Sequence, residues 1–115
     1  RMVSSAESPI HDNWKQAVVD AEETDTVFLN QHTSPALRAL RTERTNALEF
    51  DHESNAMALF GTAMDLYFGG DMEAAVALSG QVAGRIESVE PVARIIEDCA
   101  QGCLDTLQAL SSKYL

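Results

Sequence analysis

The chain has 115 residues, of which 45% are hydrophobic, and this size and composition suit one domain with a single modest core. Eight lysines and arginines against 18 aspartates and glutamates give a net charge of −10, which repels nucleic-acid phosphates and anionic membrane surfaces. No apolar run is long enough to span a bilayer and no secretion signal is recognisable, so we expect a cytoplasmic protein that binds neither nucleic acid nor membrane.

The first thirty residues predict a strand end, a helix and an extended segment. Residues 2–5 have the composition of a short strand that leads into a loop. Ser8 is a suitable N-cap with Pro9 at the first helical position, and apolar residues follow at helical spacing from Ile10 to Ala21. Residues 24–30 are β-branched and aromatic, which is typical of a strand. Since the only other candidate strand is residues 2–5, we expect the missing strands of this sheet upstream of the chain.

The middle of the chain predicts three helices. Ser34 and Pro35 repeat the cap signal and open a helix that continues to Leu48. Arg38, Arg41 and Arg44 lie on or near its polar side, either as a solvated helix face or as a contact for the phosphate of a nicotinamide cofactor. A further helix is expected from Ser54 to the pair Gly69-Gly70, and Asp71 is expected to cap a short helix toward Leu78.

The last segment predicts a long amphipathic helix over residues 92–114, because apolar side chains recur there at steps of three and four. Cys99 and Cys103 fall on one face of it, where we expect buried small side chains rather than a disulfide. The three histidines fit no zinc spacing, so no metal site is expected. Together the predicted helices cover roughly 60% or more of the chain, against a base rate near one third.

Residues 69–89 hold four of the six glycines, around the polar pair Ser79 and Gln81. Two explanations are open. Gly80 and Gly84, four residues apart, could let two helices approach closely while Ser79 and Gln81 end an element. Alternatively the stretch is a loop that lets a flat ligand approach, with Ser79 and Gln81 as hydrogen-bonding groups.

Three stretches carry a resemblance to a known family: RMVSSAESPIHDNWKQAVVDA, TDTVFLNQHTSPALRALRTE and GGDMEAAVALSGQVAGRIESVEPVARIIE. They resemble the nitronate monooxygenases (formerly 2-nitropropane dioxygenases) and their close relatives, the FMN-dependent enoyl-acyl-carrier-protein reductases. The third stretch is the most specific, because Gly70-Asp71, Gly80-Gln81 and Gly84 follow the family's order. Thr42, where the family has Asn, and Arg85, where an aliphatic residue is usual, depart from its pattern.

The resemblance implies that this chain is the C-terminal fragment of an FMN-binding TIM (β/α)8 barrel together with its small helical domain. Residues 1–30 would end the barrel, with its last strand, the following helix and an extended segment, and residues 31–115 would form the helical domain and the C-terminal helix. The family's phosphate-binding Gly-Thr pair would lie immediately before Arg1. The resemblance therefore makes Arg1 a candidate neighbour of the FMN phosphate, and Ser79, Gly80 and Gln81 candidate neighbours of the flavin ring.

The implied function is flavin-mediated oxidation of alkyl nitronates with oxygen, on a small-molecule substrate. One alternative is an FMN-dependent enoyl-acyl-carrier-protein reductase that uses NAD(P)H, and another, from a different class, is a non-catalytic helical interaction module. We find no carboxylate pair that serves as acid and base, so the catalytic groups are expected upstream and the isolated chain is expected to bind no FMN. His32 is a weaker candidate for the active site, Trp14 is expected to anchor its helix, and a homodimer stays open.

Overall fold

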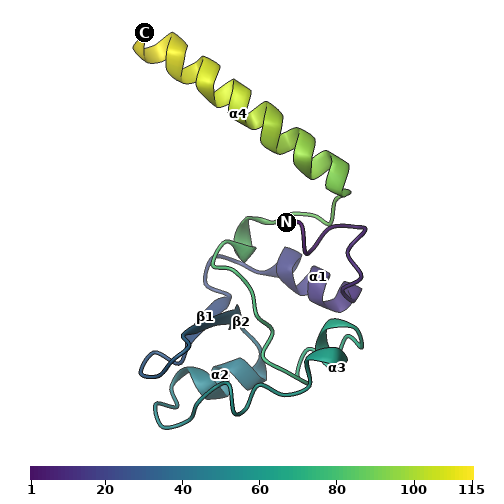
Figure 1. Cartoon of the computed structure of the whole chain (residues 1–115), viewed down its shortest axis with the longest axis vertical. Coiled ribbons are helices and arrows are strands. Elements are labelled where there is room, and N and C mark those ends of the chain that lie inside the picture. Colours follow the sequence, from purple (N-terminus) through teal and green to yellow (C-terminus); the bar gives the residue numbers. More distant parts are fainter.

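The computed structural model describes all residues, 1–115, as a small body from which one long helix projects (Figure 1). The body contains α1 (Asp12–Asp20), β1 (Thr26–Leu29), β2 (Leu37–Leu40), α2 (Glu43–Glu49), α3 (Ala63–Tyr67) and the 3-10 turn η1 (Ala83–Arg85). The projecting helix is α4 (Val92–Tyr114), which confirms the helix predicted there. Because of α4 the molecule is elongated, with extents of 54 × 31 × 21 Å.

The strand predicted at residues 24–30 is confirmed as β1, but its partner lies within this chain. β1 pairs antiparallel with β2, from Thr26 opposite Leu40 to Leu29 opposite Leu37. The helix predicted from Ser34 is therefore wrong over residues 37–40, and β1 does not depend on a strand upstream of the chain for its pairing. β2 buries both Ala39 and Leu40, so it lacks the alternation that distinguishes a strand from a helix.

The helices of the body are shorter than the sequence predicts. α1 begins at Asp12 rather than Pro9, and its N-cap is His11 rather than Ser8, because the Nδ1 atom of His11 accepts a hydrogen bond from the backbone N–H of Asn13 at 3.1 Å. Residues 2–5 form turns instead of a strand, and the helix expected from Ser54 is reduced to α3. The four α-helices have 9, 7, 5 and 23 residues, less than half of the chain, so the expected helix content of roughly 60% is wrong.

The segment after α3 is held by turns. Gly70 has φ +79°, which agrees with the predicted helix stop at Gly69-Gly70. Asp71 caps no helix, and its carboxylate instead accepts the backbone N–H of Glu73 at 3.0 Å inside a turn. The chain from Ala75 to Leu78 then runs extended beside β2, where the backbone N–H of Leu40 donates to the carbonyl of Ala77 at 2.8 Å.

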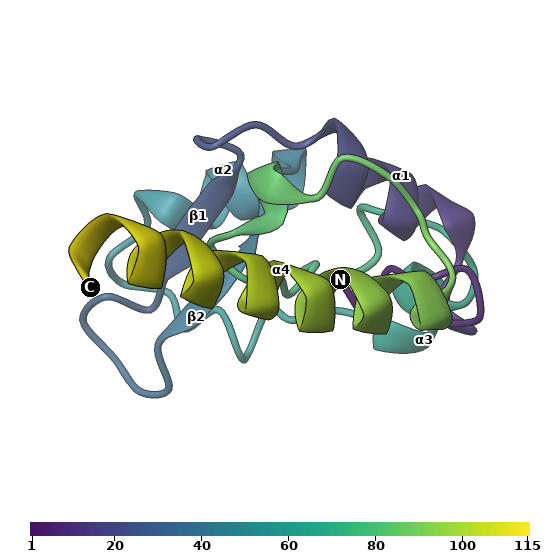
Figure 2. The ribbon, with the colours of Figure 1, turned by 90° about the horizontal axis from the view of Figure 1, so that it is seen from above.

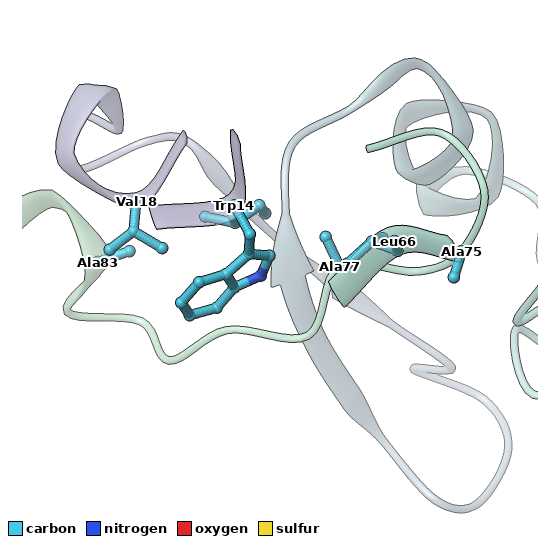
Figure 3. Packing of buried hydrophobic residues seen from close by; sticks show 7 residues of the cluster. Trp14, Val18, Leu66, Ala75, Ala77 and Ala83 are labelled. Atoms are coloured by element: carbon cyan, nitrogen blue, oxygen red, sulfur yellow. The ribbon is translucent and has the colours of Figure 1, made fainter. Parts of the chain in front are cut away.

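Two small clusters of buried side chains form the core. The first lies between α1, α3 and the segments around residues 75–77 and 83 (Figure 3) and includes Trp14, Val18, Leu40, Leu66, Ala75, Ala77 and Ala83. The second comprises Val27, Leu29, Ala39, Ala56 and Val76. Trp14 is 6% exposed, which confirms its expected role as the anchor of α1.

Seen from above, α4 lies across the body in projection (Figure 2), yet only Ile95 of its residues is buried. Cys99 and Cys103 are exposed free thiols, so their expected burial is wrong within this chain. None of the helices combines the length and the apolar character that crossing a bilayer needs.

Candidate functional site

The main pocket of the body lies between the amino-terminal turn, α1 and residues 78–86, and has a volume of about 490 Å³. Ten of its fourteen lining residues are hydrophobic. Ile10, Trp14 and Val18 line it from α1 and the turn before it, and Leu78, Val82 and Ile86 from the opposite segment. Pockets of this size and apolar lining are typical of small-molecule sites.

The loop Leu78–Gly80 forms one wall of this pocket. Its backbone is fixed by two hydrogen bonds: the N–H of Leu78 donates to Tyr67 Oη at 3.0 Å, and the N–H of Ser79 donates to the carbonyl of Arg38 at 3.1 Å. Of the predicted site residues, Ser79 and Gly80 line the pocket together with Arg1, whereas Gln81 is exposed and outside the lining.

Gly80 and Gly84 differ in their surroundings. A Cβ at Gly84 would lie 2.6 Å from the carbonyl carbon of Glu22, so this glycine allows η1 to pack closely against the chain that follows α1. A Cβ at Gly80 would meet nothing within 4 Å. Close packing therefore explains the glycine at position 84, although it packs against a loop and not against a second helix as predicted. No contact within this chain explains the glycine at position 80.

Arg1 borders the pocket with its guanidinium already engaged. It forms an ion pair with Glu90 and a second one with Asp98 at an N–O distance of 3.1 Å. Hydrogen bonds to Glu90 and Asp98 raise the pKa of Arg1, so its side chain stays charged. These contacts tie the amino-terminal turn to the start of α4.

Tyr67, which falls within the helix predicted from Ser54 to Gly69-Gly70, also lines the pocket. Burial raises the pKa of its phenol, although the hydrogen bond from Leu78 N–H acts in the opposite direction. Its ring lies against Trp14, with ring centroids 6.2 Å apart. The indole Nε1 of Trp14 is the one buried side-chain polar atom without a hydrogen-bond partner.

The arginines predicted along one helix face are engaged elsewhere. Arg38, on β2, lies over the ring of Phe28 at 5.5 Å from its centroid. Arg41 pairs with Glu49 at 2.8 Å, and Arg44 donates to the carbonyl of Glu73 at 2.7 Å. These contacts replace the predicted solvated helix face, and none of the three arginines lines the main pocket.

His32 lies away from the main pocket. It contacts His52 edge to face, with ring centroids 4.6 Å apart, in a small polar cleft beside Asp51. No three side chains of the metal-binding types gather anywhere in the chain.

No protein-family model matches the chain, and no curated protein does. Solved structures do. FabK from Thermotoga maritima superposes with a TM-score of 0.87 and 31% identity, over 98% of this chain and 38% of FabK. A single-substitution mutant of that FabK gives a TM-score of 0.82 with 31% identity, over 98% of this chain and 35% of the other.

This chain is similar to part of FabK. It spans less than two fifths of the length of FabK, so the similarity covers a segment and not a whole enzyme. The sheet within this segment has two strands, and the barrel that the resemblance implies is not contained in it. The similarity to FabK agrees with the reductase branch of the resemblance and lends no specific weight to the nitronate monooxygenase branch.

Proposed function

We propose that this chain is part of an FMN-dependent enoyl-acyl-carrier-protein reductase of the FabK type, and that the Leu78–Gly80 loop faces the cofactor. The single observation that carries the proposal is the similarity to FabK over 98% of the chain at 31% identity. FMN would supply hydride transfer from NAD(P)H to an unsaturated thioester, and the protein contributes binding and orientation. The remainder of a FabK-like fold would supply the barrel and the catalytic groups.

The residues that are present fit a flat ring at one point. Gly80 borders an apolar pocket and has open space where a Cβ would stand. Glycine at such a position permits close approach of a ligand to the backbone. Ser79 lies beside it on the same wall, and Gln81 follows on the exposed side, so both would offer hydrogen bonds to the ring or the substrate.

Arg1 fits the phosphate less directly. Its guanidinium is occupied by Glu90 and Asp98, so contact with a phosphate requires it to share or exchange one of these carboxylates. We therefore assign the ring-facing role to Gly80 and Ser79 first, and keep Arg1 as a proposed neighbour of the phosphate.

The test uses the intact protein and the substitution Gly80→Val. We expect at least a tenfold loss of FMN affinity, measured by flavin fluorescence, because the new side chain occupies the space left for the ring. The denaturation midpoint of the FMN-free protein should stay unchanged, since nothing in the chain lies within 4 Å of the added Cβ. Gly102→Val is the control, because Gly102 also has open space but lies on α4, away from the pocket.

Turnover separates the two branches of the resemblance. The proposal expects NAD(P)H-dependent reduction of an enoyl thioester and no oxygen consumption with an alkyl nitronate. Oxygen consumption with the nitronate, without enoyl reduction, would contradict the proposal and favour nitronate monooxygenase activity. Absence of bound FMN in the intact protein would remove the proposal altogether.

A further inference from the structure

We propose that the main pocket binds the acyl part of a thioester, with the hydroxyl of Tyr67 donating a hydrogen bond to its carbonyl oxygen. The inference rests on the proposed function for the thioester as substrate class. It adds a place for the acyl chain and a residue that recognises the carbonyl group.

The lining of the pocket favours an uncharged, mostly apolar ligand. Arg1 is the one charged residue among the lining residues, and its charge is matched by Glu90 and Asp98. No carboxylate lines the pocket. A free anion or cation would lose its hydration there without gaining an opposite charge, whereas a hydrocarbon chain would gain from leaving water.

The hydroxyl of Tyr67 is positioned by the chain and keeps its own proton available. Its oxygen accepts the backbone N–H of Leu78 at 3.0 Å, and no group of the chain accepts its O–H. A phenol is protonated at neutral pH and can donate its O–H, and burial moves the pKa of Tyr67 further from neutral. The side chain is therefore prepared to donate one hydrogen bond to an oxygen acceptor.

Tyr67 also links the apolar wall to the loop assigned to the flavin. Its ring packs on Trp14, and its hydroxyl contacts the backbone of Leu78, next to Ser79 and Gly80. A ligand that reaches this hydroxyl would have its chain among the apolar residues and its carbonyl end near the Leu78–Gly80 loop. An acyl thioester has this distribution of groups.

The experiment compares two ligands in the intact protein: an acyl N-acetylcysteamine thioester, and the thioether that has the same chain but no carbonyl oxygen. Bromine at the end of each chain quenches nearby tryptophan emission. Trp14 is the only tryptophan of these 115 residues and lines the pocket, so Trp14→Phe identifies its contribution. We expect saturable quenching of Trp14 by both ligands, with the thioester binding about 3- to 10-fold more tightly.

Tyr67→Phe should weaken the thioester by about the same 3- to 10-fold and leave the thioether unchanged. Tyr114→Phe removes the same hydroxyl from an exposed residue of α4 and should change neither affinity. Leu78→Gln places an amide in the lining and should weaken both ligands, whereas Leu59→Gln changes a leucine outside the pocket and should weaken neither.

Equal affinities of the thioester and the thioether in the unsubstituted protein would overturn the assignment of Tyr67, whatever the stability of the variants. Lack of saturable quenching of Trp14 would overturn the acyl site. Failure of the proposed function has a different signature, the absence of FMN or of NAD(P)H-dependent turnover, and that result leaves thioester binding measurable.

Discussion

Gly84 and Gly80 lie four residues apart, and their backbones meet different surroundings. Gly84 faces the peptide bond that joins Glu22 to Glu23. A Cβ at position 84 would lie 2.6 Å from the carbonyl carbon of Glu22 and 2.8 Å from the backbone nitrogen of Glu23. Backbone atoms at such distances cannot move aside as a flexible side chain can. Gly84 is thus a packing residue, and the space at Gly80 is left for something outside these 115 residues.

Gly84→Ala should therefore destabilise the protein by about 1–3 kcal/mol, the usual effect of adding a methyl group to a tightly packed contact. Gly80→Ala adds the same methyl group in open space and should stay within about 0.5 kcal/mol. Urea denaturation of both variants measures the difference. Equal midpoints for the two variants would show that the contact between η1 and the chain after α1 is not as close as described.

Tyr67 gives a second prediction at the residue scale, in alkaline solution. Its phenol pKa is raised in the folded protein, so between pH about 10 and the folded pKa the unfolded state loses the proton first. The unfolded state then binds fewer protons than the folded one, and the free energy of unfolding falls as pH rises.

Tyr67→Phe should remove this part of the alkaline decline, and Tyr114→Phe should keep it, because it changes an exposed tyrosine of α4 and leaves the phenol of Tyr67 in place. The measurement is the unfolding free energy between pH 9 and about 11 for the three proteins. Parallel declines in all three would mean that the phenol of Tyr67 is no harder to ionise in the folded chain than in the unfolded one.

At the scale of elements, the turn from β2 into α2 depends on a reciprocal cap. The side chain of Thr42 accepts the N–H of Thr45 at 3.2 Å, and the hydroxyl of Thr45 accepts the N–H of Thr42 at 2.8 Å. The family's usual residue at position 42 is Asn, which is also a favoured N-cap, so the departure at Thr42 keeps the chemistry of the cap.

Thr42→Ala should cost about 1 kcal/mol of stability, since it leaves the backbone N–H of Thr45 without its side-chain acceptor. Thr62 offers a matched control, because it precedes α3 without any side-chain cap bond. We expect Thr62→Ala to have less than half of that effect in the same denaturation experiment. A larger loss at Thr62 than at Thr42 would contradict the role given to the cap.

The elements that the sequence predicts well are those whose signal is local and continuous. α4 repeats its apolar spacing over 23 residues, and β1 is marked by its β-branched and aromatic composition. β2 is different: Leu40 lies in one buried cluster with Ala75 and Ala77, and Ala39 lies in the other with Val76. These partners are far along the chain, and periodicity cannot detect such contacts.

The candidate site shows the same contrast between residues with a local sequence signal and residues that depend on distant contacts. Ser79 and Gly80 are marked by an unusual concentration of glycine, and both reach the pocket. Tyr67 was missed, because in sequence it is one more apolar position of a helix. Its significance depends on where its hydroxyl meets the backbone of Leu78, eleven residues later. The nearest sequence signal is a tyrosine directly before the glycine pair that ends the helix.

At the scale of the whole molecule, α4 is an amphipathic helix with its apolar side uncovered. Ile96, Leu107 and Leu110 are 54%, 60% and 49% exposed, and Cys99 and Cys103 lie between them on the same side. A stripe of this length loses the free energy of apolar burial unless another surface covers it. The chain corresponds to less than two fifths of FabK, so we expect the rest of a FabK-like fold to supply that surface.

Leu107→Lys tests this expectation in the intact protein. If α4 is covered, a charge within the apolar stripe should lower the free energy of unfolding by about 2–4 kcal/mol, whereas Gln101→Lys on the opposite side should change it by less than about 0.5 kcal/mol. The dependence on protein concentration identifies the covering surface. A loss that is the same at all concentrations places the covering surface within one chain, and a loss that shrinks on dilution places it on a second copy. An unchanged midpoint would leave α4 uncovered and contradict the prediction.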